Sequence, residues 1–259
     1  MKKPSKSFVN KLTKLVIVLE ILIVFSLMVN FSQGYKLKKP FHCEDCNVLL
    51  ITMDSLRADH VGAYGYERNT TPTIDFLAKK GVLFENVIAS APLTFISLPM
   101  MISSSKPFLS SFSEPSDEHV FILNNQTTIT KSLKNNSFKT ISIMNNDITY
   151  TNLLKDFDSK EVFDFEDDSL ITAKAIDYLS SFNQQKFFLW IHYISPHSPY
   201  KPANPYDSIF YKDDLYNFSK LFPVKEVSEF VNLNFSDGNF YISQYDGEIK
   251  FIDNEIKKL

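Results

Sequence analysis

The 259-residue sequence is poor in cysteine, glycine and tryptophan, and it carries little net charge. Its formal net charge of −3 gives no reason to expect nucleic acid as a partner, because nucleic-acid binding relies on concentrated positive charge. No internal repeat and no long low-complexity stretch is visible. Apolar residues are abundant, at 44% of the chain with 24 phenylalanines, which is enough for one sizeable core.

The only two cysteines are Cys43 and Cys46, in the segment HCEDC. A closed zinc site needs four ligands, and this short segment offers few others. A thioredoxin-type motif normally opens a helix, whereas a strand-like run follows here. Outside the cytoplasm the pair can close a small disulfide loop. A structural or incidental role is favoured over redox or metal chemistry, and all of these stay open.

The N-terminal region combines a basic start with an apolar run. Lysines are spread over residues 1–14, and the run LVIVLEILIVFSLMVNF follows over 15–31, with Glu20 as its only charge. The run approaches the ~20 residues that cross about 30 Å of hydrocarbon as a helix. Lysines before such a run predict a cytoplasmic N-terminus and an extracytoplasmic domain, held at the cell membrane by a single pass.

Two alternatives to this anchor are a cleaved signal peptide and a buried core helix. The run is apolar on all faces and lies at the terminus, which argues against a core helix. No convincing small-residue cleavage site follows it, which argues against cleavage. We therefore expect a basic cytoplasmic tail over 1–14, a transmembrane signal-anchor over 15–31 and a linker over 32–46.

From residue 47 onward, strand-like and helix-like segments alternate. A continuous apolar run predicts a strand covered on both faces over 47–53, and 186–193 is predicted to be another buried strand. Residues 82–89 and 138–144 are also predicted to be strands. Helical spacing and capping signals, including Thr71 as an N-cap, predict helices over 71–80, 127–134, 168–182 and 240–259. Residues 195–237 read mostly as loop. The alternation predicts an α/β fold, a layered sandwich with a mostly parallel sheet.

Ligands of parallel sheets lie beyond the carboxyl ends of the strands, and reactive side chains follow three of the predicted strands. Asp54 follows the first, where a carboxylate suits a hard divalent cation or caps a turn. Thr94 and Ser97 precede a short helix predicted over 98–103, whose N-terminus favours an anion, although simple capping also explains them. His192 and His197 end the last strand, where imidazole binds metal, transfers protons or is structural.

Three segments, in matching order and spacing, carry a family resemblance. MDSLRADHVGAYGYERNTTPTIDFLAKKGVLFENVIASAP resembles the N-terminal region of sulfatases, FLWIHYISPHSPYKP resembles their later W-x-H-x-x-x-P-H-x-P-Y segment, and YDGEIKFIDNEIKKL resembles the helix that follows it. The region 47–259 is therefore identified as a member of the sulfatase family, within the alkaline phosphatase superfamily. The resemblance implies a metal-dependent α/β domain that cleaves or transfers sulfate or phosphate esters.

The resemblance also implies roles for individual residues. Asp54 stands at the position of a metal ligand, and Thr94 at that of the nucleophile, which also contacts the metal. His197 matches the catalytic, substrate-contacting histidine. Ser97 matches the serine of the nucleophile motif, and His192 matches an earlier histidine, with substrate binding or a structural role implied for them. The expected ion is Ca²⁺, with Mn²⁺ or Zn²⁺ as alternatives.

Several positions depart from the family pattern. Thr94 is neither Cys nor Ser, so formylglycine is not expected; threonine is more similar to lipoteichoic acid synthases and phosphoethanolamine transferases. Ser55 replaces a frequent second aspartate, and Ile96 and Leu98 replace a proline and an arginine. The resemblance further implies a D-H-G-type segment with more metal ligands after the last helix. The sequence stops at Leu259, before it, so we expect a partial domain.

Three hypotheses follow from these observations. The first is a membrane-anchored hydrolase or transferase of sulfate or phosphate esters. The second is a catalytically inactive, membrane-tethered binding or interaction protein. The third is one half of a split enzyme, whose C-terminal half is a separate chain. Nothing in the loops identifies the ester.

Overall fold

The computed structural model describes residues 19–20, 43, 45–104, 127–145, 153–164, 167–182, 185–211 and 238–259. The chain divides into two units, Met1–Cys46 and Asn47–Leu259. In the first unit, Leu19 and Glu20 are helical, and a disulfide joins Cys43 to Cys46. No helix within the described ranges is long and apolar enough to cross a membrane. The predicted tail and nearly all of the predicted anchor and linker lie outside those ranges.

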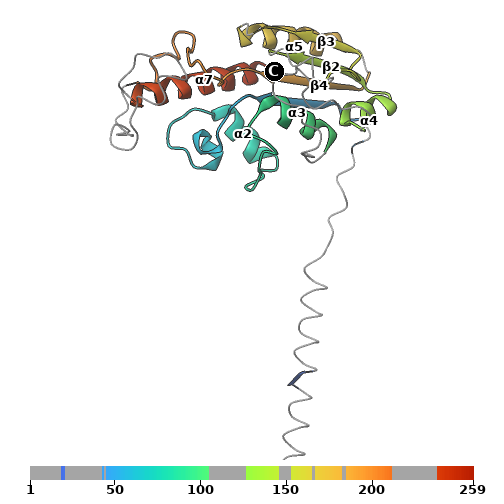
Figure 1. The fold of residues 1–259 in the computed structure, drawn as a ribbon, viewed down its shortest axis with the longest axis horizontal. Helices are drawn as coiled ribbons and strands as arrows, with labels where there is room; N and C mark the ends of the chain where they lie inside the picture. Colours follow the sequence, from blue (N-terminus) through green and yellow to red (C-terminus); the bar gives the residue numbers. More distant parts are fainter. Residues whose placement is uncertain are drawn as a thin grey trace, which may run out of the picture. The chain divides into compact units, whose positions relative to one another are not determined.

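The second unit is built on a parallel sheet, as the alternating pattern predicts (Figure 1). Its described strands, in the spatial order β1-β4-β2-β3, are β1 (Val48–Met53), β4 (Phe187–Tyr193), β2 (Lys139–Met144) and β3 (Ser159–Val162). Every neighbouring pair is parallel. All seven residues of β4 are buried, which explains why its sequence, FFLWIHY, is almost continuously apolar.

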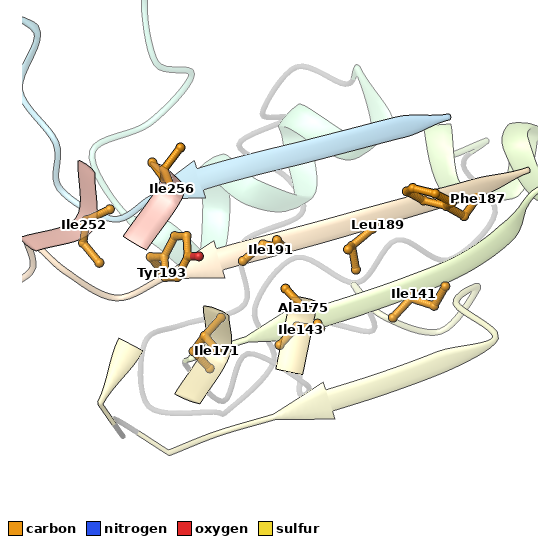
Figure 2. Packing of buried hydrophobic residues seen from close by; sticks show 10 residues of the cluster. All are labelled: Ile141, Ile143, Ile171, Ala175, Phe187, Leu189, Ile191, Tyr193, Ile252 and Ile256. Atoms are coloured by element: carbon orange, nitrogen blue, oxygen red, sulfur yellow. The ribbon is translucent and has the colours of Figure 1, made fainter. Parts of the chain in front are cut away.

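Helices cover both faces of the sheet (Figure 1). Successive strand residues point to opposite faces, so Phe188 and Trp190 pack with α3 (Thr94–Ser103) on one side. The helix α4 (Ile129–Asn135) adds Leu133 to this face. Figure 2 shows the other face, where α5 (Asp168–Ser181) and α7 (Gly238–Lys258) pack apolar side chains against β2 and β4.

The helix α2 (Pro72–Lys80) follows two 3-10 turns, η1 (Ala58–His60) and η2 (Gly62–Tyr64). Thr71 precedes α2 but does not cap it, so this part of the prediction is wrong. The free N–H groups of Thr73 and Ile74 instead donate to the carboxylate of Asp253, on α7, at 2.9–3.0 Å. Thr71 is engaged elsewhere: its hydroxyl donates to Asp75 and accepts from the N–H of Gly62.

Two segments differ from the sequence prediction. Residues 82–89 form no strand, and Val82 and Ile88 are 78% and 92% exposed, so their apolar character does not reflect burial within the described part of the chain. The helix α3 begins at Thr94, four residues before the predicted start at Leu98. The predicted loop after Ser195 is confirmed as far as Tyr211, and residues 212–237 lie outside the described ranges.

Candidate functional site

The carboxyl ends of β1, β4 and β2 lie level with one another. His192 pairs with Thr52 on one side and with Met144 on the other. Main-chain hydrogen bonds continue one residue further, from Asp54 N to the Tyr193 carbonyl and from Asn145 N to the His192 carbonyl, both at 3.0 Å. This register brings side chains from three strands to one edge of the sheet, where ligands of parallel sheets bind.

Asp54 is the buried carboxylate at this edge. Its Oδ1 accepts a hydrogen bond from Ser55 Oγ, and its Oδ2 accepts one from Thr94 Oγ1, both 2.9 Å long. Burial alone would raise the pKa of Asp54, but His192 and the hydroxyls of Ser55 and Thr94 outweigh it and hold the pKa below its ordinary value. Asp54 is therefore ionised at neutral pH.

His192 lies beside Asp54 and is only 1% exposed. Its Nδ1 lies 2.9 Å from Thr52 Oγ1, and the same hydroxyl accepts a hydrogen bond from Trp190 Nε1 at 3.0 Å. The other ring nitrogen, Nε2, has no hydrogen-bond partner among the described residues and lies 3.8 Å from Asp54 Oδ2. Thr52 thus fixes the ring so that its one unpartnered polar atom faces the candidate metal ligand.

Thr94 is the first residue of α3, after Leu93 as the extended N-cap residue. Within the described ranges no side-chain cap is made by Leu93, and the N-terminus of a helix favours an anion. Ser97 is half-buried one turn later, and its N–H donates to the Leu93 carbonyl within the helix. Leu98, at the position where the family resemblance implies an arginine, is buried in the apolar core.

His197 makes no contact with this group within the described ranges. It is exposed on the loop after β4, and its Nδ1 donates to the Ser198 carbonyl at 2.6 Å. None of its contacts within the described ranges reaches Asp54 or Thr94. Of the five site residues predicted from sequence, the structure brings Asp54, Thr94 and His192 together and keeps Ser97 on the same helix as Thr94, while His197 bonds within its own loop.

The oxygen atoms of Asp54 and Thr94 fit one side of a divalent cation site, since hard cations prefer carboxylate and hydroxyl ligands. The orphaned Nε2 of buried His192, aimed at the same place, supports this fit. Within the described ranges, however, no group of three or more His, Cys, Asp or Glu side chains could surround an ion. The residues present therefore fit part of a metal site.

Sequence reasoning did not identify Thr52 and Trp190 as parts of this site. Thr52 lies one residue before the end of β1, which is a positional signal, whereas Trp190 lies in the middle of β4 and gives none. Both residues read as ordinary members of apolar strands. The role of Ser55, which donates to Asp54 and whose φ of 58° turns the chain, could not be read from its residue type.

Comparison with known proteins shows a family and a shared fold. The family model described as Sulfatase matches residues 46–259. A protein of Escherichia coli K12 described as "Putative transferase YhbX" is 38% identical over 56 residues, which are 22% of this chain and 10% of that protein.

Two solved structures share the fold. One is the C-terminal periplasmic domain of EcEptC from Escherichia coli, in complex with Zn, with a TM-score of 0.59 and 17% identity over 84% of this chain and 60% of that chain. The other is the "putative sulfatase yidJ" from Bacteroides fragilis, with a TM-score of 0.62 and 20% identity over 86% of this chain and 59% of that chain. The chain therefore spans about three fifths of each structure.

Proposed function

The chain belongs to the sulfatase family, and from that premise we propose that it hydrolyses or transfers phosphate or sulfate esters with the help of a divalent cation. The observation that carries the proposal is the hydrogen bond from Thr94 Oγ1 to Asp54 Oδ2 at the carboxyl edge of the sheet. It joins a nucleophile candidate to an ionised carboxylate. Because Thr94 cannot become formylglycine, phosphate esters are the favoured substrates.

In the proposed reaction, Thr94 Oγ1 attacks the phosphorus or sulfur of the ester, and the bond to the leaving oxygen breaks. The hydroxyl proton is lost to solvent water, since Asp54 stays ionised, and His197 gives a proton to the leaving oxygen. Ser97 and the N–H groups at the start of α3 contact the anionic group. Water or an acceptor alcohol then removes the group from Thr94, which gives hydrolysis or transfer.

A divalent cation bound by Asp54 and Thr94 would lower the pKa of the threonine hydroxyl and neutralise charge on the ester. We propose Ca²⁺ first, with Mn²⁺ and Zn²⁺ as alternatives; the solved EcEptC domain contains Zn. Two protein ligands are too few for a tight site, so the remaining ligands have to come from outside the described residues or from a separate chain that completes the domain.

Turnover of an aryl sulfate and of a phosphodiester, each with Ca²⁺, Mn²⁺ or Zn²⁺ added, tests this function. We expect Thr94→Ala to abolish turnover in the presence of the activating ion. Ser103→Ala is the matched control, because it removes a hydroxyl from the same helix that donates to the Pro99 carbonyl. Activity that survives Thr94→Ala unchanged would remove Thr94 from the role of nucleophile.

We also propose that residues 15–31 anchor the chain in the cell membrane, with residues 1–14 in the cytoplasm and the domain outside. The basic residues before the run support this orientation, and the Cys43–Cys46 disulfide is typical of oxidising compartments. In Cys46→Ser, the freed Cys43 should react with a membrane-impermeant maleimide added to intact cells lacking an outer membrane. Labelling only after lysis would place the domain in the cytoplasm.

A second candidate function is that of an inactive, membrane-tethered binding protein. It is favoured by the burial of Leu98 where a substrate-binding cation is expected, and by the small number of metal ligands in the described ranges. Calorimetric titration of the chain with divalent ions separates the two candidates. Tight, stoichiometric binding would count against the inactive protein, and its absence together with no turnover would favour it.

A further inference from the structure

The loop that carries His197, residues 194–201, is held by two buried carboxylates from different helices. Asp168 is the first residue of α5, and Glu248 lies in the middle of α7. Neither residue was singled out by sequence. We propose that Asp168 and Glu248 are positioning residues that fix this loop and thereby the place of His197. The inference rests on the proposed function insofar as His197 is expected to contact the ester.

Asp168 holds the start of the loop with both carboxylate oxygens. Its Oδ1 accepts from Asn145 Nδ2 at 2.6 Å and from Ile194 N at 3.3 Å, and its Oδ2 accepts from Ser195 N at 2.9 Å. Burial raises the pKa of Asp168, and these hydrogen bonds oppose that rise, so the contacts of Asp168 matter through its two acceptor oxygens. Three donors thus converge on one side chain, which ties the end of β2 to the loop after β4. Only a carboxylate offers acceptors on both branches.

Glu248 holds the far end of the loop in a different way. Its Oε1 accepts from Lys201 N at 2.8 Å, and its carboxylate also bonds the Ser195 side chain. Burial raises the pKa of Glu248, and the nearby charges of Asp168 and Asp167 raise it further. A hydroxyl both donates and accepts, so the Ser195 bond can form with either branch of an amide. The contacts of Glu248 therefore require an acceptor but not a negative charge.

This difference gives the two residues opposite responses to amide substitution. Glu248→Gln keeps an oxygen for Lys201 N and should preserve the loop. Asp168→Asn instead places an N–H₂ group against a main-chain N–H on one of its branches, where two donors face each other. If the two carboxylates only supported the fold in general, the loop would not be preserved in Glu248→Gln and disturbed in Asp168→Asn.

Asp253 is the matched control on the same helix. Like Glu248, it is a buried α7 carboxylate that accepts from main-chain N–H groups, but its partners are Thr73 and Ile74 of α2. Asp253→Ala should lower overall stability without touching the loop. It therefore separates the loss of a buried carboxylate from the loss of loop positioning.

Amide hydrogen exchange of the full chain in detergent, with NMR of the His197 ring, tests the proposal. We expect Glu248→Ala to speed exchange at Lys201 about tenfold and to shift the ring resonances, whereas Glu248→Gln stays near wild type. Asp168→Asn should speed exchange at Ser195 to a similar degree. If Asp168→Asn does not fold, the Glu248 pair alone decides. The proposal is overturned if Glu248→Ala leaves loop and ring unchanged, or if Asp253→Ala changes them equally.

The same samples, titrated with inorganic sulfate and inorganic phosphate, separate this inference from the proposed function. In one result the loop responds to the substitutions as expected, but the chain binds neither anion and turns over neither ester. This result supports the positioning role and contradicts the proposed function. In the opposite result the wild type binds an anion, and Glu248→Ala and Asp168→Asn both show the same loop exchange and the same anion affinity as the wild type. This result overturns the positioning role and leaves the proposed function standing.

Discussion

The hydroxyl of Thr94 donates to Asp54 Oδ2 at 2.9 Å, although 40 residues separate the two side chains along the chain. The contact joins the end of β1 to the first turn of α3. A carboxylate that accepts from two hydroxyls while buried is held in one orientation before any ion arrives. The affinity for a metal ion should therefore depend on the charge of Asp54 more strongly than the stability of the fold does.

We expect Asp54→Asn to weaken binding of the activating divalent ion by at least about 100-fold, as measured by calorimetry, since a charged ligand of the ion is lost. Thermal stability should change little, because an amide still accepts from Thr94. The control is Asp59→Asn, which removes an exposed carboxylate paired with Arg57. Equal ion affinity in Asp54→Asn and the wild type would exclude Asp54 as a ligand.

The second prediction concerns the buried ion pair of Arg68 and Asp246, whose side chains are 1% and 0% exposed. Asp246 also accepts from Tyr66 and contacts His60, which ties α7 to the segment after Asp54. Arg68→Met removes the balancing cation and should lower the free energy of unfolding by about 3–5 kcal/mol, because an uncompensated charge stays buried. Urea titration measures this loss.

The double variant Arg68→Met with Asp246→Asn supplies the control for this pair. Neutralising Asp246 removes the charge that Arg68 balanced, so the double variant should be more stable than Arg68→Met alone. If the two losses simply added, the cost of Arg68→Met would come from lost packing, such as the contact of the guanidinium with the Phe210 ring, and not from charge.

The sequence predicts β4 well because burial on both faces favours an almost continuous apolar run, and β1 and β2 are also found where they are predicted. β1, β2 and β4 lie within about one residue of their predicted bounds. β3, with the sequence SKEV, lacks this signal because it is a half-exposed edge strand. Residues 82–89 are predicted to be a strand but form none. An apolar sequence indicates a tendency to be buried and does not indicate which part of the chain would bury it.

The site was predictable to the extent that it follows from strand ends. Asp54 and His192 meet because parallel strands finish at one edge, whereas Thr94 joins them from the first turn of α3, since the strand predicted before it does not form. The supporting residues could not be found this way. Asp168, Glu248 and Asp253 accept hydrogen bonds from main-chain N–H groups of distant segments, and a main-chain N–H leaves no mark in the residue types of the sequence.

The helix α2 provides a prediction about this long-range support. Asp253 accepts from two N–H groups at the start of α2, where the sequence predicts capping by Thr71. We expect Asp253→Ala to lower the free energy of unfolding by about 1–3 kcal/mol, in the range of a lost helix cap that leaves buried donors unpaired. Lys257→Ala, an exposed change on the same helix, should be silent. Equal stability of the two variants would refute the capping role.

The last prediction is a pH dependence set by Asp158. Burial would raise the pKa of this carboxyl, but Lys134, 2.7 Å away, and hydrogen bonds from the N–H and hydroxyl of Thr140 outweigh it and lower the pKa from 3.8 to about 2. Because the pKa is lower in the folded state, the contribution of Asp158 to stability is fully present above about pH 4. It is lost as the pH falls toward 2.

The difference in unfolding free energy between the wild type and Asp158→Asn should therefore shrink between pH 4 and pH 2. At neutral pH it should be about 1 kcal/mol, because solvent screens this partly exposed pair. Lys134→Met should remove most of the same pH dependence, since the ammonium group is a main cause of the lowered pKa. A difference that stays constant from pH 6 to pH 2 would show that Asp158 acts by packing or hydrogen bonding independent of its charge.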